Sequence, residues 1–128
     1  MKIAVVTATY QRSDGKSPFY LKRCMDSVFS QTHQDFKMYV IGDKYEDDKE
    51  FFHIVLEYSS DKLFYRNLPN AIEREIYGKH KDILWCCGGL SANNYGIALA
   101  LIDSFQYICY LDDDDYWTND HLEVISKV

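Results

Sequence analysis

The sequence predicts an α/β fold in which helices cover a mainly parallel central sheet. Three observations lead to this prediction: short apolar runs suited to buried strands, helical periodicity between them, and alternation of the two along the chain. Right-handed crossovers place such strands parallel and put the helices on the faces of the sheet. A chain of 128 residues suffices for one hydrophobic core but not for two ordinary domains. Residues 1–128 are therefore expected to form a single domain.

The first half of the chain predicts three strands and two helices. Residues 2–8 form a continuous apolar run, which is typical of a strand covered on both faces. Ser17-Pro18 is a favourable helix start, because serine is a good N-cap and proline suits the first helical position. Residues 36–41 predict a second strand, 47–58 a second helix and 62–67 a third strand.

The second half predicts a turn or short helix over residues 71–77 and a longer helix over 93–105. The apolar side chains expected on one face of the longer helix are Ile97, Leu101 and Phe105. The run 107–111 is apolar and predicts a buried fourth strand. A last helix is expected after the capping residues 118–120.

The most informative feature is a run of four aspartates, Asp112 to Asp115, directly after the fourth predicted strand. Adjacent carboxylates repel one another, and a divalent cation that neutralises them is the first candidate reason for their position. In an extended segment alternate side chains share a face, so Asp112 and Asp114 can address one ion. Mg²⁺ and Mn²⁺ prefer oxygen ligands, and Mg²⁺ is typically held by carboxylates together with substrate phosphates. The alternative is a solvated acidic loop that caps the next helix.

Polar side chains also follow the other predicted strands. Thr9 and Tyr10 follow the first strand, Asp43 the second and Asn67 the third. Ligands of open α/β sheets bind at the carboxyl ends of the strands. Tyr10 can stack on a planar base, and Asp43 can accept a hydrogen bond from a base or a ribose. With a metal on the acidic run, these residues indicate a nucleoside diphosphate pocket. Taken singly, Tyr10 is explained equally well as a loop aromatic, and Asp43 is explained better as a turn residue.

Charge and composition argue against several kinds of partner and location. A net charge of −6 disfavours nucleic acid or an anionic membrane as the main partner. No apolar stretch approaches the roughly 20 residues that span a bilayer, and the first apolar run is shorter than that of a signal peptide. We therefore expect a soluble, cytoplasmic protein. The cysteines form no Cys-x-x-Cys pair, which argues against a zinc site.

Missing motifs argue against other enzyme classes. No Gly-x-Gly-x-x-Gly follows the first strand and no Gly-x-x-x-x-Gly-Lys occurs, so neither a dinucleotide fold nor a P-loop is indicated. A metal-dependent phosphotransferase, a further hypothesis, would carry a nucleophilic aspartate at the end of the first strand. That strand ends here in residues 7–10, Thr-Ala-Thr-Tyr, which counts against this class.

The motifs together resemble those of the family 2 glycosyltransferases of the GT-A fold, over nearly the whole chain. Residues 5–12 are similar to the first-strand motif I-x-P-T-Y-N-R, and residues 21–32 to the helix motif L-x-x-C-I-x-S-I-x-x-Q-T. Residues 40–43 resemble the second strand with its base-contacting aspartate. Residues 111–117 resemble the metal motif L-D-x-D-D-x-W.

The resemblance implies a GT-A, Rossmann-like α/β/α sandwich, truncated relative to a full catalytic domain. It also implies a transferase that moves a sugar from a nucleotide diphosphate donor, a UDP- or GDP-sugar, to the hydroxyl of an unknown acceptor. Asp113 would approach the ribose, and Asn94 matches the asparagine of the family motif Ala-Arg-Asn-x-Gly. The implied residues are Thr9, Tyr10, Asp43, Asn94 and Asp113 for the nucleotide, and Asp112 and Asp114 for Mn²⁺ or Mg²⁺.

Two departures from the family pattern bear on function. Asn93 replaces the arginine of Ala-Arg-Asn-x-Gly, so we expect the corresponding cationic contact with the nucleotide to be missing. Family catalytic domains are longer and carry the acceptor site and general base beyond the metal motif, so no catalytic base is assigned. The alternative function is a non-catalytic nucleotide-sugar-binding module or fragment that lacks the acceptor half. A truncated sheet is also expected to expose an edge, which favours a homo-oligomer.

Overall fold

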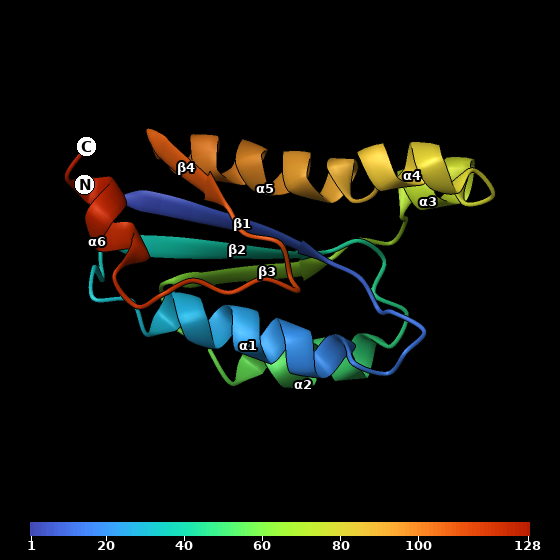
Figure 1. The fold of residues 1–128 in the computed structure, drawn as a ribbon, viewed down its shortest axis with the longest axis horizontal. Coiled ribbons are helices and arrows are strands. Elements are labelled where there is room, and N and C mark those ends of the chain that lie inside the picture. The colour runs from blue at the N-terminus through green and yellow to red at the C-terminus, as the bar shows by residue number, and fades with distance from the viewer.

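A computed structural model describes residues 1–128 and shows a four-stranded, fully parallel sheet between two layers of helices (Figure 1). The strands are β1 (Ile3–Thr9), β2 (Phe36–Gly42), β3 (Leu63–Asn67) and β4 (Tyr107–Tyr110). The helices are α1 (Ser17–Phe29), α2 (Asp48–Leu56), α3 (Ile72–Tyr77), α4 (Lys81–Cys87), α5 (Leu90–Ile102) and α6 (His121–Ser126). Helices α1 and α2 lie on one side of the sheet, and α3, α4 and α5 on the other (Figure 1). The predicted α/β sandwich is confirmed.

The order of the strands places a topological switch point beside β1. The sheet order is β3-β2-β1-β4, so the chain builds outward from β1 to β3 and then crosses to the opposite side of β1. Ile3 is in register with Phe36 of β2 and with Tyr107 of β4. The carboxyl ends of β1 and β4 therefore lie next to each other, where ligands bind in sheets of this kind.

Apolar side chains alternate along β1 and fill a core on each face of the sheet. Ile3 and Val5 belong to a cluster of 16 buried residues that includes side chains of α1, α2 and α6. Ala4 and Val6 belong to a second cluster of five buried residues with Ala100 of α5. The two clusters fix the positions of the helices relative to the strand ends. No helix is both long and apolar enough to cross a membrane.

Helix α5 packs on the sheet through small residues. Its buried positions are Ala92, Gly96 and Ala100, which recur every four residues and so share one face. A Cβ atom added to Gly96 would lie 2.6 Å from Cγ1 of Val6, closer than real Cβ contacts. The predicted inner face was wrong, because Leu101 is exposed and Phe105 lies beyond the end of the helix.

Replacing Gly96 by valine should therefore destabilise the fold. We expect the free energy of unfolding to fall by about 1 to 3 kcal/mol, because overpacking forces the backbone of α5 away from β1. Urea denaturation of Gly96→Val measures the loss. Ala98→Val is the matched control, because Ala98 is an exposed position of the same helix, and it should cost less than about 1 kcal/mol. Equal losses in the two variants would contradict the close approach.

The fourth strand lies at the edge of the sheet, and the prediction that it is buried is wrong. β4 pairs only with β1, and Tyr107 and Tyr110 are 48% and 59% exposed. An apolar run does not distinguish a central strand from an edge strand whose side chains are partly covered. The free edge is the kind of surface on which strands of other chains can pair, and self-association stays a prediction.

Candidate nucleotide and metal site

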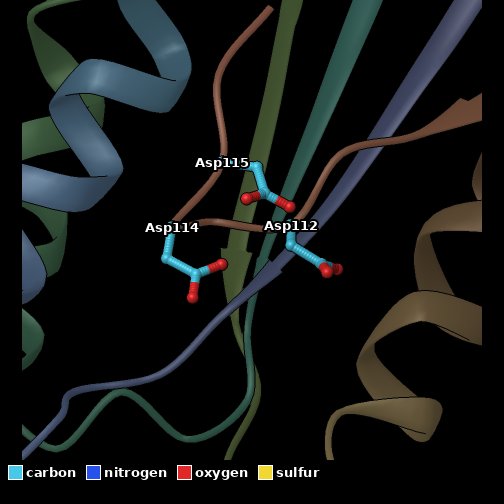
Figure 2. A group of neighbouring side chains, drawn as sticks. All are labelled: Asp112, Asp114 and Asp115. Carbon is cyan, nitrogen blue, oxygen red and sulfur yellow. The ribbon is translucent and has the colours of Figure 1, made fainter.

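The four aspartates form a tight turn at the end of β4 instead of continuing the strand. The N–H of Asp115 donates a hydrogen bond to the carbonyl of Asp112, at 3.0 Å. As a result Asp112, Asp114 and Asp115 each offer a carboxylate oxygen, and these oxygens all lie within 4.8 Å of one another (Figure 2). We call these three side chains the carboxylate cluster. The predicted pair, Asp112 and Asp114, is thus brought together, and Asp115 joins it because the turn replaces the expected extended alternation.

The carboxylate cluster suits a hard divalent cation. Its donors are carboxylate oxygens of exposed residues, which are the ligands that Mg²⁺ and Mn²⁺ prefer, and its open side leaves room for water or phosphate oxygens. Although Asp112 is exposed, partial desolvation of its carboxylate raises its pKa, and the neighbouring charges of Asp115, Asp114 and Asp113 raise it further. A bound cation would relieve this repulsion, so the residues present fit the metal that the motif implies.

Asp113 points the other way and ties the turn to the end of β1. It is 5% exposed. Its Oδ2 accepts hydrogen bonds from Thr9 Oγ1 at 2.8 Å and from Arg12 Nη1 at 2.9 Å, and its Oδ1 accepts one from Arg12 Nη2 at 2.7 Å. The hydrogen bonds and charge of Asp113 raise the pKa of Arg12. A ribose could reach Asp113 only by sharing this carboxylate with Arg12.

Two side chains of α1 hold the turn from its other side. Arg23 donates a hydrogen bond to the carbonyl of Asp114 at 2.8 Å, and Ser27 Oγ accepts one from the N–H of Trp117 at 3.1 Å. Arg12 Nη2 also lies 3.7 Å from Oδ2 of Asp114. The backbone of the turn is therefore fixed by contacts to β1 and α1, while the carboxylate cluster stays exposed. Such fixed geometry is what a metal site requires.

Tyr10 and Asp43 meet at a third arginine, Arg74 of α3. The guanidinium of Arg74 lies 3.5 Å from the ring centroid of Tyr10, and its Nε donates to Oδ2 of Asp43 at 3.0 Å. Asp43 is 1% exposed, and its Oδ1 has no hydrogen-bond partner. Burial raises the pKa of Asp43, although the charge of Arg74 opposes this shift. A buried acceptor without a partner is costly, so Asp43 is suited to receive an N–H or O–H group of a ligand.

Gly42 and Asn67 fix the backbone beside Asp43. Asn67 Oδ1 accepts a hydrogen bond from the N–H of Tyr45, and its Nδ2 donates to the carbonyl of Tyr45, both at 2.8 Å. A Cβ atom at position 42 would lie 2.2 Å from Asn67 Oδ1, so only glycine allows this approach. The polar residue after the third strand thus positions the loop that carries Asp43.

A cavity of about 170 Å³, which we call the central pocket, lies at these strand ends. Its lining residues are Ala8, Thr9, Tyr10, Asp43, Arg74, Gly88, Gly89, Asn93, Asp112, Asp113 and Asp114. All the predicted site residues line it except Asn94, which is exposed, whereas its neighbour Asn93 lines the pocket. The central pocket joins the ends of β1 and β2 to the turn after β4 and the start of α5.

Sequence reasoning missed several residues of the site. Arg12 stands within the first-strand motif, so that motif offered a signal for it. Arg74 lies in a charged helix and carries no motif, and only the fold brings it to Tyr10 and Asp43. The arginines near this site, Arg12 and Arg74, are paired with Asp113 and Asp43, and the expected lack of a cationic contact at position 93 stays a prediction.

The Arg74 and Asp43 pair gives a stability prediction. Arg74→Met should lower the free energy of unfolding by about 1 to 3 kcal/mol, because it leaves the Asp43 carboxylate buried without a donor. Thermal and urea denaturation measure the change. The double variant Arg74→Met with Asp43→Asn should recover part of the loss, because the uncompensated charge is gone. Lys44→Met is the control, since the contact of Lys44 with Glu75 is long, at 3.9 Å, and such exposed pairs contribute little. A loss in the control as large as in Arg74→Met would contradict the assignment.

Comparisons with known proteins bear on what this pocket does. No family model matches the chain. An uncharacterized glycosyltransferase, R139, of Acanthamoeba polyphaga mimivirus is 40% identical over 123 residues, which are 96% of this chain and 49% of that protein. The succinoglycan biosynthesis protein ExoW of Rhizobium meliloti (strain 1021) is 34% identical over 121 residues, or 94% of this chain and 32% of that protein. This chain thus spans a third to a half of these relatives.

The fold has a counterpart among solved structures. The crystal structure of S. aureus TarS 1-349 in complex with UDP matches 99% of this chain and 31% of that chain, with a TM-score of 0.70 and 19% sequence identity. The predicted GT-A fold, truncated relative to the longer proteins, is confirmed by this match. The predicted likeness to part of a glycosyltransferase is confirmed by the similarity to the mimivirus protein.

Proposed function

Because the chain is similar in sequence to the mimivirus glycosyltransferase R139 and in fold to TarS, which was crystallised with UDP, we propose that it binds a nucleotide diphosphate sugar for glycosyl transfer. The single observation that carries the proposal is the central pocket, where Tyr10, the unpartnered oxygen of Asp43 and the aspartate turn meet. These groups match, in order, an aromatic base, a donor on the nucleoside and a diphosphate with its metal. TarS was crystallised in complex with UDP, which supports a uridine nucleotide as the first ligand to test.

In this proposal each residue has a defined task. Tyr10 offers its ring to the base, and Asp43 accepts a hydrogen bond from the nucleoside while Arg74 holds both side chains in place. Thr9 and Arg12 fix Asp113, which sets the position of the turn. Asp112 and Asp114 would hold Mn²⁺ or Mg²⁺, with Asp115 as a further oxygen donor. The metal, when bound, supplies positive charge that stabilises the departing diphosphate.

A turnover assay tests the proposed function. The protein is incubated with UDP-glucose, UDP-N-acetylglucosamine, UDP-galactose or GDP-mannose in the presence of Mn²⁺, and the release of UDP or GDP is followed. Release by the wild type, and its loss in Asp43→Ala, is the expected result. Asp61→Ala is the control, because Asp61 is an exposed residue outside the pocket. Nucleotide binding without any release would support the non-catalytic binding module instead.

A further inference from the structure

Helices α3 and α4 bury few side chains of their own. They lie side by side past the start of α5 (Figure 1). Glu73 is the one buried residue of α3, and α4 has none. Most of the large apolar side chains of the two helices are exposed instead, namely Ile72, Ile76, Tyr77, Ile83 and Trp85. Helices of six and seven residues are not stable in isolation, so their position depends on contacts other than apolar burial.

Glu73 makes such a contact with the start of α5. Its Oε1 accepts a hydrogen bond from the backbone N–H of Ser91, in the first turn of α5. The N–H groups of a first helical turn need acceptors. The residue at the cap position is Gly89, which has no side chain to accept a hydrogen bond and whose φ of +80° favours glycine. Glu73 therefore supplies the cap that α5 lacks, from 18 residues earlier in the chain.

This contact explains why a carboxylate is buried at position 73. Glu73 is 6% exposed, and its Oε2 has no hydrogen-bond partner. Burying a carboxylate is costly, so packing alone would favour an apolar residue here. The N-terminal end of α5, a helix of 13 residues, carries partial positive charge and offsets part of that cost. The hydrogen bond and the charge together fix α3 at one place against α5.

Glu73 directly precedes the residue that joins α3 to the nucleotide pocket. The guanidinium of Arg74 lies 3.5 Å from the ring centroid of Tyr10, and its Nε donates to Oδ2 of Asp43 at 3.0 Å. Arg74 of α3 and Gly89 at the start of α5 both line the central pocket. A shift of α3 against α5 would therefore move Arg74 away from its partners and change the shape of the pocket.

We propose that Glu73 is a positioning residue of the nucleotide site. By capping α5 it holds α3 in place, and α3 in turn holds the guanidinium of Arg74 at Tyr10 and Asp43. Glu73 does not itself line the central pocket, so it acts through Arg74 and not by contact with the ligand. The inference rests on the proposed function.

Titration calorimetry of UDP in Mn²⁺ tests this role with single and double variants. Glu73→Ala should weaken UDP binding by about fivefold or more. In the Arg74→Met background the same change should alter the affinity by less than about twofold, because the residue through which Glu73 acts is gone. Asp82→Ala is the matched control, since it removes an exposed carboxylate from α4, and it should leave the affinity within about twofold. Wild-type affinity in Glu73→Ala, or a loss that persists in full in the Arg74→Met background, would overturn the proposal.

Conservative variants separate positioning from a loss of charge or of the fold. Glu73→Gln keeps an oxygen that can accept the hydrogen bond from Ser91, so it should bind UDP more tightly than Glu73→Ala. Glu73→Asp keeps the charge, but its carboxylate is one methylene short of Ser91, so it should weaken UDP binding by at least about threefold. Wild-type affinity in Glu73→Asp, or equal affinities in Glu73→Gln and Glu73→Ala, would contradict the role.

Hydrogen exchange tests the contact between α3 and α5 without any nucleotide. In Glu73→Ala the backbone amides of residues 72–87 should exchange at least about tenfold faster, while those of β1 and β2 should be unchanged. Unaltered exchange over residues 72–87 would show that Glu73 does not hold the two helices. Failure of UDP to bind the wild type would reject the proposed function, and with it the effect of Glu73 on nucleotide affinity, whereas the exchange rates would still decide whether Glu73 holds α3 in place.

Discussion

Replacing Arg12 by methionine is expected to lower the free energy of unfolding by about 3 to 5 kcal/mol. Arg12 makes a bidentate contact with Asp113, at 2.9 and 2.7 Å, and Asp113 is buried between the ends of β1 and β4. Without the guanidinium, this carboxylate would remain buried with Thr9 as its one side-chain donor. The loss arises from the uncompensated charge more than from the missing contact. Urea denaturation followed by circular dichroism measures it.

Controls separate this effect from the removal of an arbitrary positive charge. Lys22→Met removes an exposed partner of Glu57 at 3.2 Å and should cost less than about 1 kcal/mol. Adding Asp113→Asn to Arg12→Met should restore part of the stability, because the uncompensated charge is gone. If Arg12→Met costs no more than Lys22→Met, the buried pair does not hold the turn in the way described.

Replacing Asp114 by asparagine should weaken Mn²⁺ binding by at least about tenfold, by removing a charged ligand from the carboxylate cluster. The fold should persist, because the Asp114 side chain is 51% exposed and its ion contact with Arg12 is long, at 3.7 Å. Electron paramagnetic resonance of free Mn²⁺ measures the affinity without any need for turnover. The nucleotide affinity measured in Mn²⁺ should fall toward the value measured in EDTA.

Asp61→Asn is the matched control for Asp114→Asn, because it removes the same charge from an exposed position outside the cluster. Its Mn²⁺ affinity should stay within about twofold of the wild type, since Asp61 precedes β3 at the opposite end of the parallel sheet and charges exposed to solvent are screened by salt. Equal Mn²⁺ affinity in Asp114→Asn and the wild type would mean that the acidic turn is not the metal site.

The sequence predicted the fold well because its signals are local. The strands alternate with helices in distinct apolar patterns, and the family motifs fall at the strand ends. Burial depends on neighbours that are distant in sequence, and here prediction failed. The run 107–111 is apolar, yet β4 lies at an edge. The inner face of α5 is made of small residues, because a short distance between helix and sheet, and not hydrophobicity, selects Gly96.

Part of the site was predicted, because some of its residues follow directly from the positions of the strands. Thr9, Tyr10, Asp43 and the aspartates follow strands, and parallel strands bring their carboxyl ends together. The turn at Asp113 changed which carboxylates meet, because one backbone hydrogen bond between Asp115 and Asp112 replaces the extended alternation. Arg74 reaches the site from α3, which no spacing along the sequence indicates.

Titration of UDP into the full chain, once with Mn²⁺ and once with EDTA, tests the central claim most directly. Isothermal calorimetry gives the affinity and stoichiometry in both conditions, with GDP and ADP as comparison nucleotides. A metal-dependent nucleotide pocket predicts one binding site for UDP or GDP, with affinity at least about tenfold higher in Mn²⁺ than in EDTA. Binding of neither UDP nor GDP, or equal affinity with and without the metal, would contradict it.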